Sequence, residues 1–134
     1  MAKLEVVEGI GFKYAKDLRA AGVRSTGDLL KKGATPKGRE IIASKSGISK
    51  TLVLEWVNHV DLFRIKGVGE EYSDLLEEAG VDTVVELAQR NSANLYEAIQ
   101  STNVRKRLVR RPPSKKMVTD WINQAKRLPR VIQY

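Results

Sequence analysis

The chain of 134 residues has no cysteine, a single histidine and few aromatic residues. Without cysteine it forms neither disulfides nor thiolate metal sites. Because His59 is the only imidazole and no carboxylates stand at metal-ligand spacing, neither a transition-metal site nor a Ser/His/Asp or Cys/His catalytic arrangement can be assembled. We therefore expect a protein that is not an enzyme and takes no small-molecule substrate.

Long apolar runs are also missing, and none approaches the length that a bilayer requires. Glu5 stands where a signal peptide would have its apolar stretch. We therefore expect no membrane contact and a cytoplasmic location. The length suits one globular domain or two small fused ones.

Positive charge is abundant and unevenly distributed, with a formal net charge of +8. Residues 1–62 carry eleven basic and seven acidic side chains, residues 63–97 carry three and eight, and residues 98–134 carry ten and one. Two basic ends around an acidic middle favour contact with a polyanion.

Two segments of seventeen residues, at 7–23 and 65–81, have similar sequences. Each copy has a glycine-apolar-glycine turn, then apolar residues at helical spacing, then a glycine that ends the helix. A later match, Ser49 to Asn58 with Ser114 to Asn123, has an offset of 65 instead of 58. The pattern predicts an internal duplication with repeats at 1–62 and 63–134, and seven extra residues around 105–113.

Almost all of the chain is predicted to be helical, and the best strand candidate, Leu4–Val7, is short. The periodicity assigns Trp56 and Trp121 to the core, and also Tyr14 and Tyr72, whose hydroxyls are expected near the surface. The expected helix-capping side chains are Ser25, Thr35, Ser49, Asp82 or Thr83, Asn91 or Ser92, and Ser114. We expect an all-α fold of two packed helical repeats.

The glycine-apolar-glycine turns have a chemical consequence. Glycine allows positive φ and close approach of a ligand to the backbone. Amide N–H groups at the turn and at the start of the next helix then form an anion site that the helix dipole strengthens. Phosphate is the natural ligand, and phosphate contacts carry no base information.

The two similar segments resemble the helix-hairpin-helix repeats of DNA repair and replication proteins. The resemblance lies in Gly9-Ile10-Gly11 and Gly67-Val68-Gly69 and in the helix predicted after each turn. Helix-hairpin-helix repeats belong to the SAM-like, polymerase-β N-terminal class of helical domains. The whole chain, including Leu108–Pro113, resembles an uncharacterised family of tandem helix-hairpin-helix proteins that is labelled only as a domain of unknown function. The resemblance implies DNA binding. Some relatives also hold a monovalent cation on turn carbonyls, and we expect no other cofactor.

The two copies differ in the charge after the turn. Lys13, Lys16 and Arg19 follow the first turn, whereas five carboxylates follow the second, Glu70, Glu71, Asp74, Glu77 and Glu78. We therefore expect Gly9, Ile10 and Gly11 to meet phosphate. The second turn, Gly67, Val68 and Gly69, is expected to be structural or to meet a basic protein.

A second basic feature is the run from Arg105 to Lys116. Its cations are Arg105, Lys106, Arg107, Arg110, Arg111, Lys115 and Lys116. The run is either a solvated loop or a polyanion contact, and we favour the contact. We expect sequence-independent binding of nucleic acid through its backbone phosphates, with duplex DNA before RNA.

Three alternatives stay open. The acidic middle of one copy could dock the basic end of another, which would make the protein a self-assembly or interaction adaptor without nucleic acid. Only eight residues precede Gly9, so the first turn could borrow a partner helix from the other half or from a second chain. Phe12 could stack on nucleic acid or, as we favour, fill the place of that missing helix.

Overall fold

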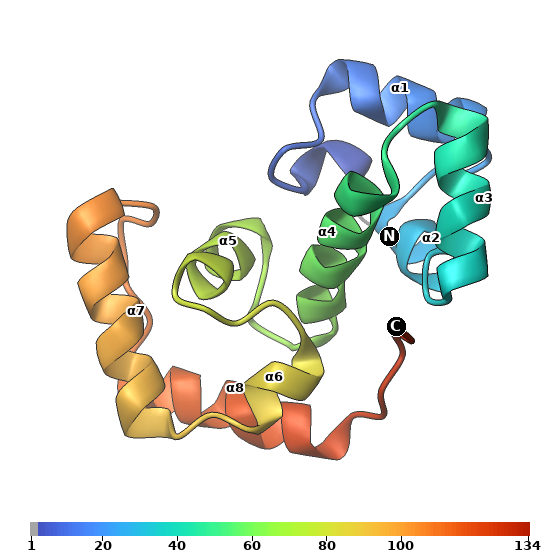
Figure 1. Cartoon of the computed structure of the whole chain (residues 1–134). Helices are drawn as coiled ribbons and strands as arrows, with labels where there is room; N and C mark the ends of the chain where they lie inside the picture. The colour runs from blue at the N-terminus through green and yellow to red at the C-terminus, as the bar shows by residue number, and fades with distance from the viewer. Residues whose placement is uncertain (1–2) are drawn as a thin grey trace. The chain divides into compact units, whose positions relative to one another are not determined.

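The computed structural model describes residues 3–134 and, within them, contains only helices, which confirms the all-α class (Figure 1). Two short 3₁₀ helices are η1 (Leu4–Val6) and η2 (Leu62–Arg64). The α-helices are α1 (Phe12–Ala20), α2 (Thr26–Lys32), α3 (Pro36–Ser46), α4 (Lys50–Asp61), α5 (Glu70–Glu78), α6 (Val84–Ala88), α7 (Ser92–Lys106) and α8 (Lys115–Arg127). The strand candidate at Leu4–Val7 is therefore wrong, because η1 occupies it.

The chain divides into two compact units. Unit 1 comprises Met1–Asp61 and Val131–Tyr134, and unit 2 comprises Leu62–Arg130. Each unit has the same order of elements, a 3₁₀ helix followed by a turn and four α-helices. The seven extra residues of unit 2 are not confined to the loop after α7. Helix α7 has 15 residues where α3 has 11, and the connection to the last helix runs over 107–114 instead of 47–49.

Six of the α-helices begin with the side-chain caps that the sequence predicts. Ser25, Thr35, Ser49, Thr83, Asn91 and Ser114 each accept a hydrogen bond from a first-turn amide, at 3.0–3.3 Å. Only α1 and α5 begin at a glycine without a side-chain cap, among the helices described. Each such cap contributes on the order of 1 kcal/mol, so these two helices lack a stabilisation that the other six have.

Unit 1 packs its helices around the buried indole of Trp56 on α4. Ala15 and Leu18 of α1 and Leu29 of α2 are completely buried, as the helical spacing predicts. The ring of Tyr14 lies 5.1 Å from that of Trp56, but Tyr14 is 37% exposed. Its assignment to the core is therefore wrong, because it covers one side of the indole from the surface.

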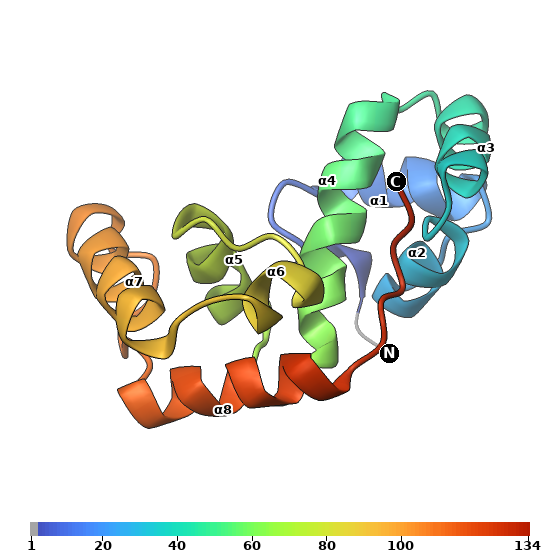
Figure 2. The same ribbon diagram turned by 60° about the horizontal axis from the view of Figure 1, so that its bottom comes forward.

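Unit 2 repeats this packing around Trp121 on α8, with Tyr72 at 5.2 Å. Leu75, Leu76 and Leu87 fill the core. Figure 2 shows α6 lying against α8, with α7 near the beginning of α8. Val104 is 77% exposed because it lies in the last turn of α7, on the outer face of that helix.

The last four residues, which the sequence-based division assigns to the second repeat, pack in unit 1. Gln133 donates its amide to the carbonyl of Ala34 at 2.7 Å, and buried Arg39 donates to the carbonyl of Gln133 at 2.8 Å. The hydroxyl of Tyr134 bonds Asn58 Oδ1 at 2.8 Å. These bonds fix the end of the described chain on α3 and α4.

Candidate functional site

The first glycine-apolar-glycine turn lies between η1 and α1. Gly9 has φ +91°, and a Cβ added to it would lie 3.3 Å from Nε1 of Trp56. Ile10 is buried and donates its amide to the carbonyl of Val7 at 3.0 Å. The turn therefore needs glycine at position 9 for conformation and for space.

Gly11 is different, because nothing in the fold requires a glycine there. Its φ of −82° suits any residue, and an added Cβ would meet no atom within 4 Å. It is the N-cap of α1, a position where Ser, Thr, Asn or Asp would cap the helix. Glycine at this place leaves the first-turn amides without a side-chain partner and leaves open space in front of them. Those two features suit an external anion.

Two free cations follow this opening. Lys13 and Lys16 are exposed and, three residues apart on α1, are neighbours on its surface. Arg19 is not equally available, because it donates to both carboxylate oxygens of Glu5, at 2.7 and 3.0 Å. The Arg19 hydrogen bond is also the main reason why the pKa of Glu5 is held below its ordinary value. Of the three cations predicted beside this turn, two therefore face solvent without a carboxylate partner.

Phe12 opens α1 and is 79% exposed. The interpretation that it fills the place of a missing helix is therefore wrong. That place is occupied within unit 1 itself, because α4 supplies Trp56 beneath Gly9 and against Tyr14. The first turn consequently needs no helix from the other half or from a second chain.

The element directly before each turn is also the same, a three-residue 3₁₀ helix. Helix α4 precedes the second turn in sequence, but it packs on α2 and α3 in unit 1. Within its own unit, each turn is therefore preceded by a 3₁₀ helix of the same length.

The second turn has the same backbone and the opposite charge. Gly67 has φ +94° and would place a Cβ 3.2 Å from Nε1 of Trp121. Gly69 leaves the start of α5 uncapped, but the exposed Glu70 and Glu71 stand in the first turn of that helix. Their carboxylates favour the positive end of their own helix and repel a second anion.

Gln124 holds the second turn in place from α8. Its Nε2 donates to the carbonyl of Lys66 at 3.1 Å, and its Oε1 accepts from the Lys66 amide at 2.9 Å. Both polar backbone groups of the residue before Gly67 are therefore satisfied within unit 2. This clamp suits an architectural role for the second turn.

The run from Arg105 to Lys116, here called the basic segment, has a fixed backbone. Asn103 bonds both the amide and the carbonyl of Val109, at 3.0 and 3.1 Å. Gln100 donates to the carbonyl of Pro113 at 3.3 Å, and the hydroxyl of Tyr72 donates to that of Arg111 at 2.9 Å. Val109 and Pro113 are buried. The segment is therefore anchored at several points and is not a freely solvated loop.

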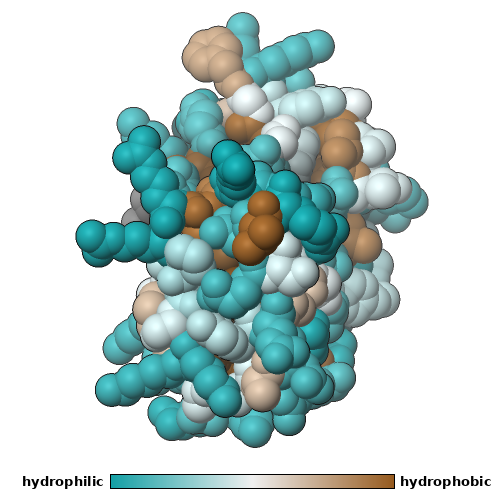
Figure 3. Space-filling model, turned by 90° about the vertical axis from the view of Figure 1, so that its left-hand side faces the viewer, coloured by the Kyte–Doolittle hydropathy of each residue, from teal (hydrophilic) through white to brown (hydrophobic). Residues whose placement is uncertain are grey.

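The side chains of the basic segment point outward from this anchored backbone. All seven cations are exposed, namely Arg105, Lys106, Arg107, Arg110, Arg111, Lys115 and Lys116. Lys106 forms an ion pair with Glu78 of α5, so part of its charge is compensated within unit 2. Figure 3, which faces the side of α7, shows hydrophilic side chains over most of the surface with small apolar patches between them. The cations therefore stand on a preorganised surface.

Arg107 occupies a strained position in this segment. It ends α7 with φ +50°, and it is the only residue other than glycine with positive φ in the described part of the chain. Helix α3 of unit 1 ends on Gly47 with φ +77° at the equivalent place. A left-handed conformation costs about 1–2 kcal/mol for a residue with a Cβ. An arginine therefore stands where the backbone favours glycine.

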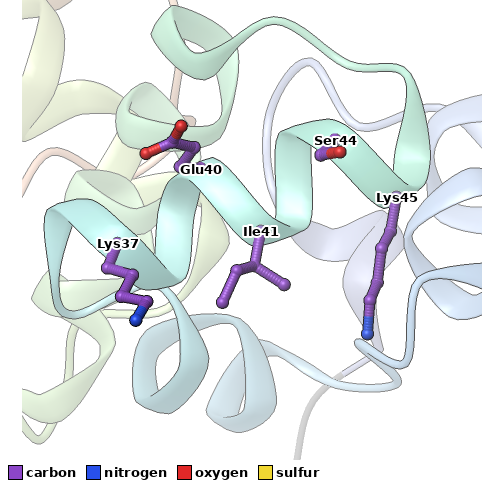
Figure 4. A pocket seen from close by; sticks show the side chains of 5 residues that line it. All are labelled: Lys37, Glu40, Ile41, Ser44 and Lys45. Carbon is purple, nitrogen blue, oxygen red and sulfur yellow. The ribbon is translucent and has the colours of Figure 1, made fainter.

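Two shallow surface hollows lie on other helix faces. One, of about 430 Å³, lies along α3 and is lined by Lys37, Lys45 and, between them, Ile41 (Figure 4). The other, of about 460 Å³, is lined on α8 by Lys115 and Lys116 of the basic segment and by Asp120. Both are open to solvent along one helix and lack converging polar groups from several elements.

Within residues 3–134, no group of three or more His, Asp or Glu side chains is placed to hold a metal ion. Nor is any helix in that range both long and apolar enough to span a bilayer.

Several residues that shape these surfaces were missed by the sequence analysis. The clamps made by Asn103 and Gln124 depend on contacts across loops, which no local pattern encodes. The left-handed Arg107 gives no signal because helix ends are usually marked by glycine or asparagine. The unusual character of Gly11 could have been recognised, since a glycine stands at an N-cap where six of the other helices use Ser, Thr or Asn.

A family model described as a domain of unknown function, DUF4332, matches residues 8–128 of the chain. No curated protein and no solved structure matches the chain.

Proposed function

We propose that this chain, which belongs to the DUF4332 family of domains of unknown function, is a non-enzymatic module that binds nucleic acid independently of sequence, duplex DNA foremost. In this proposal the two units are tandem helix-hairpin-helix repeats of the SAM-like class that arose by duplication. Unit 1 contributes its turn and unit 2 contributes the basic segment. Both contact the phosphate backbone.

One observation carries the proposal, the start of α1. Gly11 leaves the first-turn amides uncapped in open space, and the exposed Lys13 and Lys16 follow. A phosphate placed there would accept from backbone amides and lie near two unpaired cations. The helix dipole adds roughly 0.3–1 kcal/mol for an anion at an exposed helix start.

The basic segment supports the same function. Its backbone is held by side-chain hydrogen bonds, so little further ordering would oppose binding. Arg107 retains a cation in a conformation that favours glycine. Strain of this kind is more common at functional positions than elsewhere.

The predicted contact residues are not equal in this proposal. Arg19 and Lys106 already pair with Glu5 and Glu78, so a phosphate would have to replace those carboxylates. Exposed pairs of this type contribute little to stability because water and salt screen them, so they can exchange partners. We therefore expect Lys13, Lys16 and the unpaired cations of the basic segment to contribute most.

The proposal is tested by fluorescence anisotropy with a labelled duplex of random sequence over a salt series. We expect micromolar binding at about 50 mM salt that weakens steeply as salt rises. The slope of log binding constant against log salt concentration becomes shallower by about 0.9 for each phosphate contact that is lost. The double variant Lys13→Ala with Lys16→Ala should therefore have a slope that is shallower by about 2. The matched control is Lys37→Ala with Lys45→Ala on α3. Absence of micromolar binding at about 50 mM salt would end the proposal.

A further inference from the structure

We infer that the first turn contacts the face of a nucleobase as well as a phosphate, through the ring of Phe12. The inference rests on the phosphate contact of the proposed function and narrows its ligand to nucleic acid with an exposed base, at the end of a duplex or in a single-stranded segment. Phe12 is 79% exposed, the highest value among the large apolar side chains of the described chain. Such a ring gains free energy when a planar apolar surface covers it.

The fold itself does not account for an aromatic residue at this place. Phe12 is the first residue of α1, directly after the turn, and Glu70 is the first residue of α5, directly after the second turn. Both turns have nearly the same glycine conformations and the same approach to a tryptophan. Because the second turn has Glu70 at the equivalent position, neither the turn nor the start of the helix requires an apolar residue at position 12.

The surroundings of Phe12 define the chemistry of its ligand. Cα–Cβ bonds tilt toward the N-terminus of a helix, so the ring lies toward the end of α1 that carries the turn. Lys16, four residues on, shares its face of the helix, and Lys13 is adjacent. The ligand should therefore combine anionic groups with a flat apolar surface. Phosphodiesters linked to bases have both.

The state of the bases follows from this geometry. In a continuous duplex the base faces are covered by their neighbours, and a surface ring cannot stack on them without unstacking a step. In a single strand, or at the end of a duplex, a base face is free to stack on an aromatic side chain. The ring of Phe12 therefore favours nucleic acid with an unstacked base next to a phosphate.

Three labelled oligonucleotides of equal nucleotide number test this inference on the full chain at one salt concentration. They are a single strand, an open-ended duplex, and a duplex closed by hairpins at both ends. We expect the closed duplex to bind most weakly. Tight binding of the single strand identifies a single-stranded segment as the ligand, whereas tight binding of the open duplex alone identifies a strand end.

Variants at Phe12 assign the preference to the ring. Phe12→Ala should lower affinity for the preferred oligonucleotide about five-fold or more and leave the closed duplex unchanged. Phe12→Trp should retain the preference and Phe12→Leu should lose it. Val104→Ala is the control, since it removes an equally exposed apolar side chain from unit 2. Unchanged thermal unfolding shows that each variant is folded.

The outcomes separate this inference from the proposed function. Equal affinity for all three oligonucleotides, or a Phe12→Ala loss that is the same for all three, overturns the base contact and leaves phosphate binding intact. Lack of binding to any of them overturns the proposed function. Phe12-dependent sedimentation with phosphatidylserine vesicles, without a preference among oligonucleotides, assigns the ring to a lipid surface and also overturns the inference.

Discussion

The ring of Tyr14 lies 5.1 Å from the indole of Trp56, tilted at 59°, so the helix after the first turn and the last helix of unit 1 meet through two aromatic side chains. The same indole lies against Gly9. Trp56 thus positions the turn from beneath and leaves its outer side, with Gly11, open. This arrangement separates the residues that build the turn from those that can meet a ligand.

Gly9→Ala should destabilise the protein. The substitution places a Cβ at φ +91° and 3.3 Å from Trp56 Nε1, and the left-handed conformation alone costs about 1–2 kcal/mol. Chemical denaturation should show a free energy of unfolding that is lower by about that amount. Gly67→Ala in the second turn should behave in the same way, because its geometry is nearly identical. An unchanged midpoint for both variants would contradict the requirement for glycine at these two positions.

Gly11→Ser should strengthen the fold and weaken nucleic-acid binding. A serine hydroxyl at the N-cap can accept from the first-turn amides, which adds a few tenths of a kcal/mol of stability but occupies the anion site. Thermal unfolding and anisotropy measure the two effects.

The matched control is Gly69→Ser in the second turn. It should give the same stabilisation without a loss of binding, since Glu70 and Glu71 already keep phosphate away from α5. If both serine variants bind DNA as tightly as the parent protein, the amides of α1 are not part of the site.

Arg107→Gly should also act in opposite directions on stability and binding. Glycine relieves the positive φ of +50° at the end of α7, and we expect an increase in the free energy of unfolding of about 0.5–1 kcal/mol. Loss of the cation should weaken duplex binding and lower the salt slope by about 0.9. Arg110→Gly is the comparison, since it removes an exposed cation without relieving a positive φ. Equal stability changes in both variants would contradict the strain at Arg107.

The pair of Glu5 and Arg19 gives a prediction on pH. The Arg19 hydrogen bond lowers the pKa of Glu5 from its ordinary value of 4.5. A carboxyl whose pKa is lower in the folded protein than in the unfolded chain stabilises the fold at pH values above its unfolded pKa. That contribution is lost as the pH falls through the folded pKa. An NMR titration of the Glu5 side chain should show this depression, and Arg19→Ala should return the pKa toward its ordinary value. Identical titration of Glu5 in both proteins would contradict the pairing.

Self-association is a competing outcome of the charge pattern. Glu78 and Lys106 pair inside unit 2, and Tyr72 of α5 bonds the backbone of Arg111, so part of the acidic helix already holds the basic segment of the same chain. We therefore expect light scattering to report a monomer over a salt series. An oligomer that dissociates as salt rises would support an adaptor and count against this interpretation.

Local signals in the sequence predicted much of the fold. Ser25, Thr35 and Ser114 cap helices as expected, because capping depends on residues three positions apart. Trp56 and Trp121 are buried as the apolar spacing indicates. Phe12 was harder to place, because the periodicity of a helix is weakest in its first turn, where one side has no neighbouring turn.

The candidate site was less predictable than the fold. The charges after each turn could be counted from the sequence, but the pairing of Arg19 with Glu5 joins residues fourteen positions apart. The anchoring of the basic segment depends on Asn103, Gln100 and Tyr72, which reach it across tertiary contacts. Composition alone therefore cannot distinguish a preorganised cationic surface from a solvated loop.

The most direct test of phosphate contact at the first turn is the movement of backbone amide signals in ¹⁵N-labelled protein titrated with a short duplex of random sequence. We predict that the amides of Gly11, Phe12 and Lys13 shift in proportion to bound duplex, whereas those of Gly69, Glu70 and Glu71 stay in place. Saturation of binding without movement at Gly11 to Lys13, or with equal movement at both turns, would contradict the account.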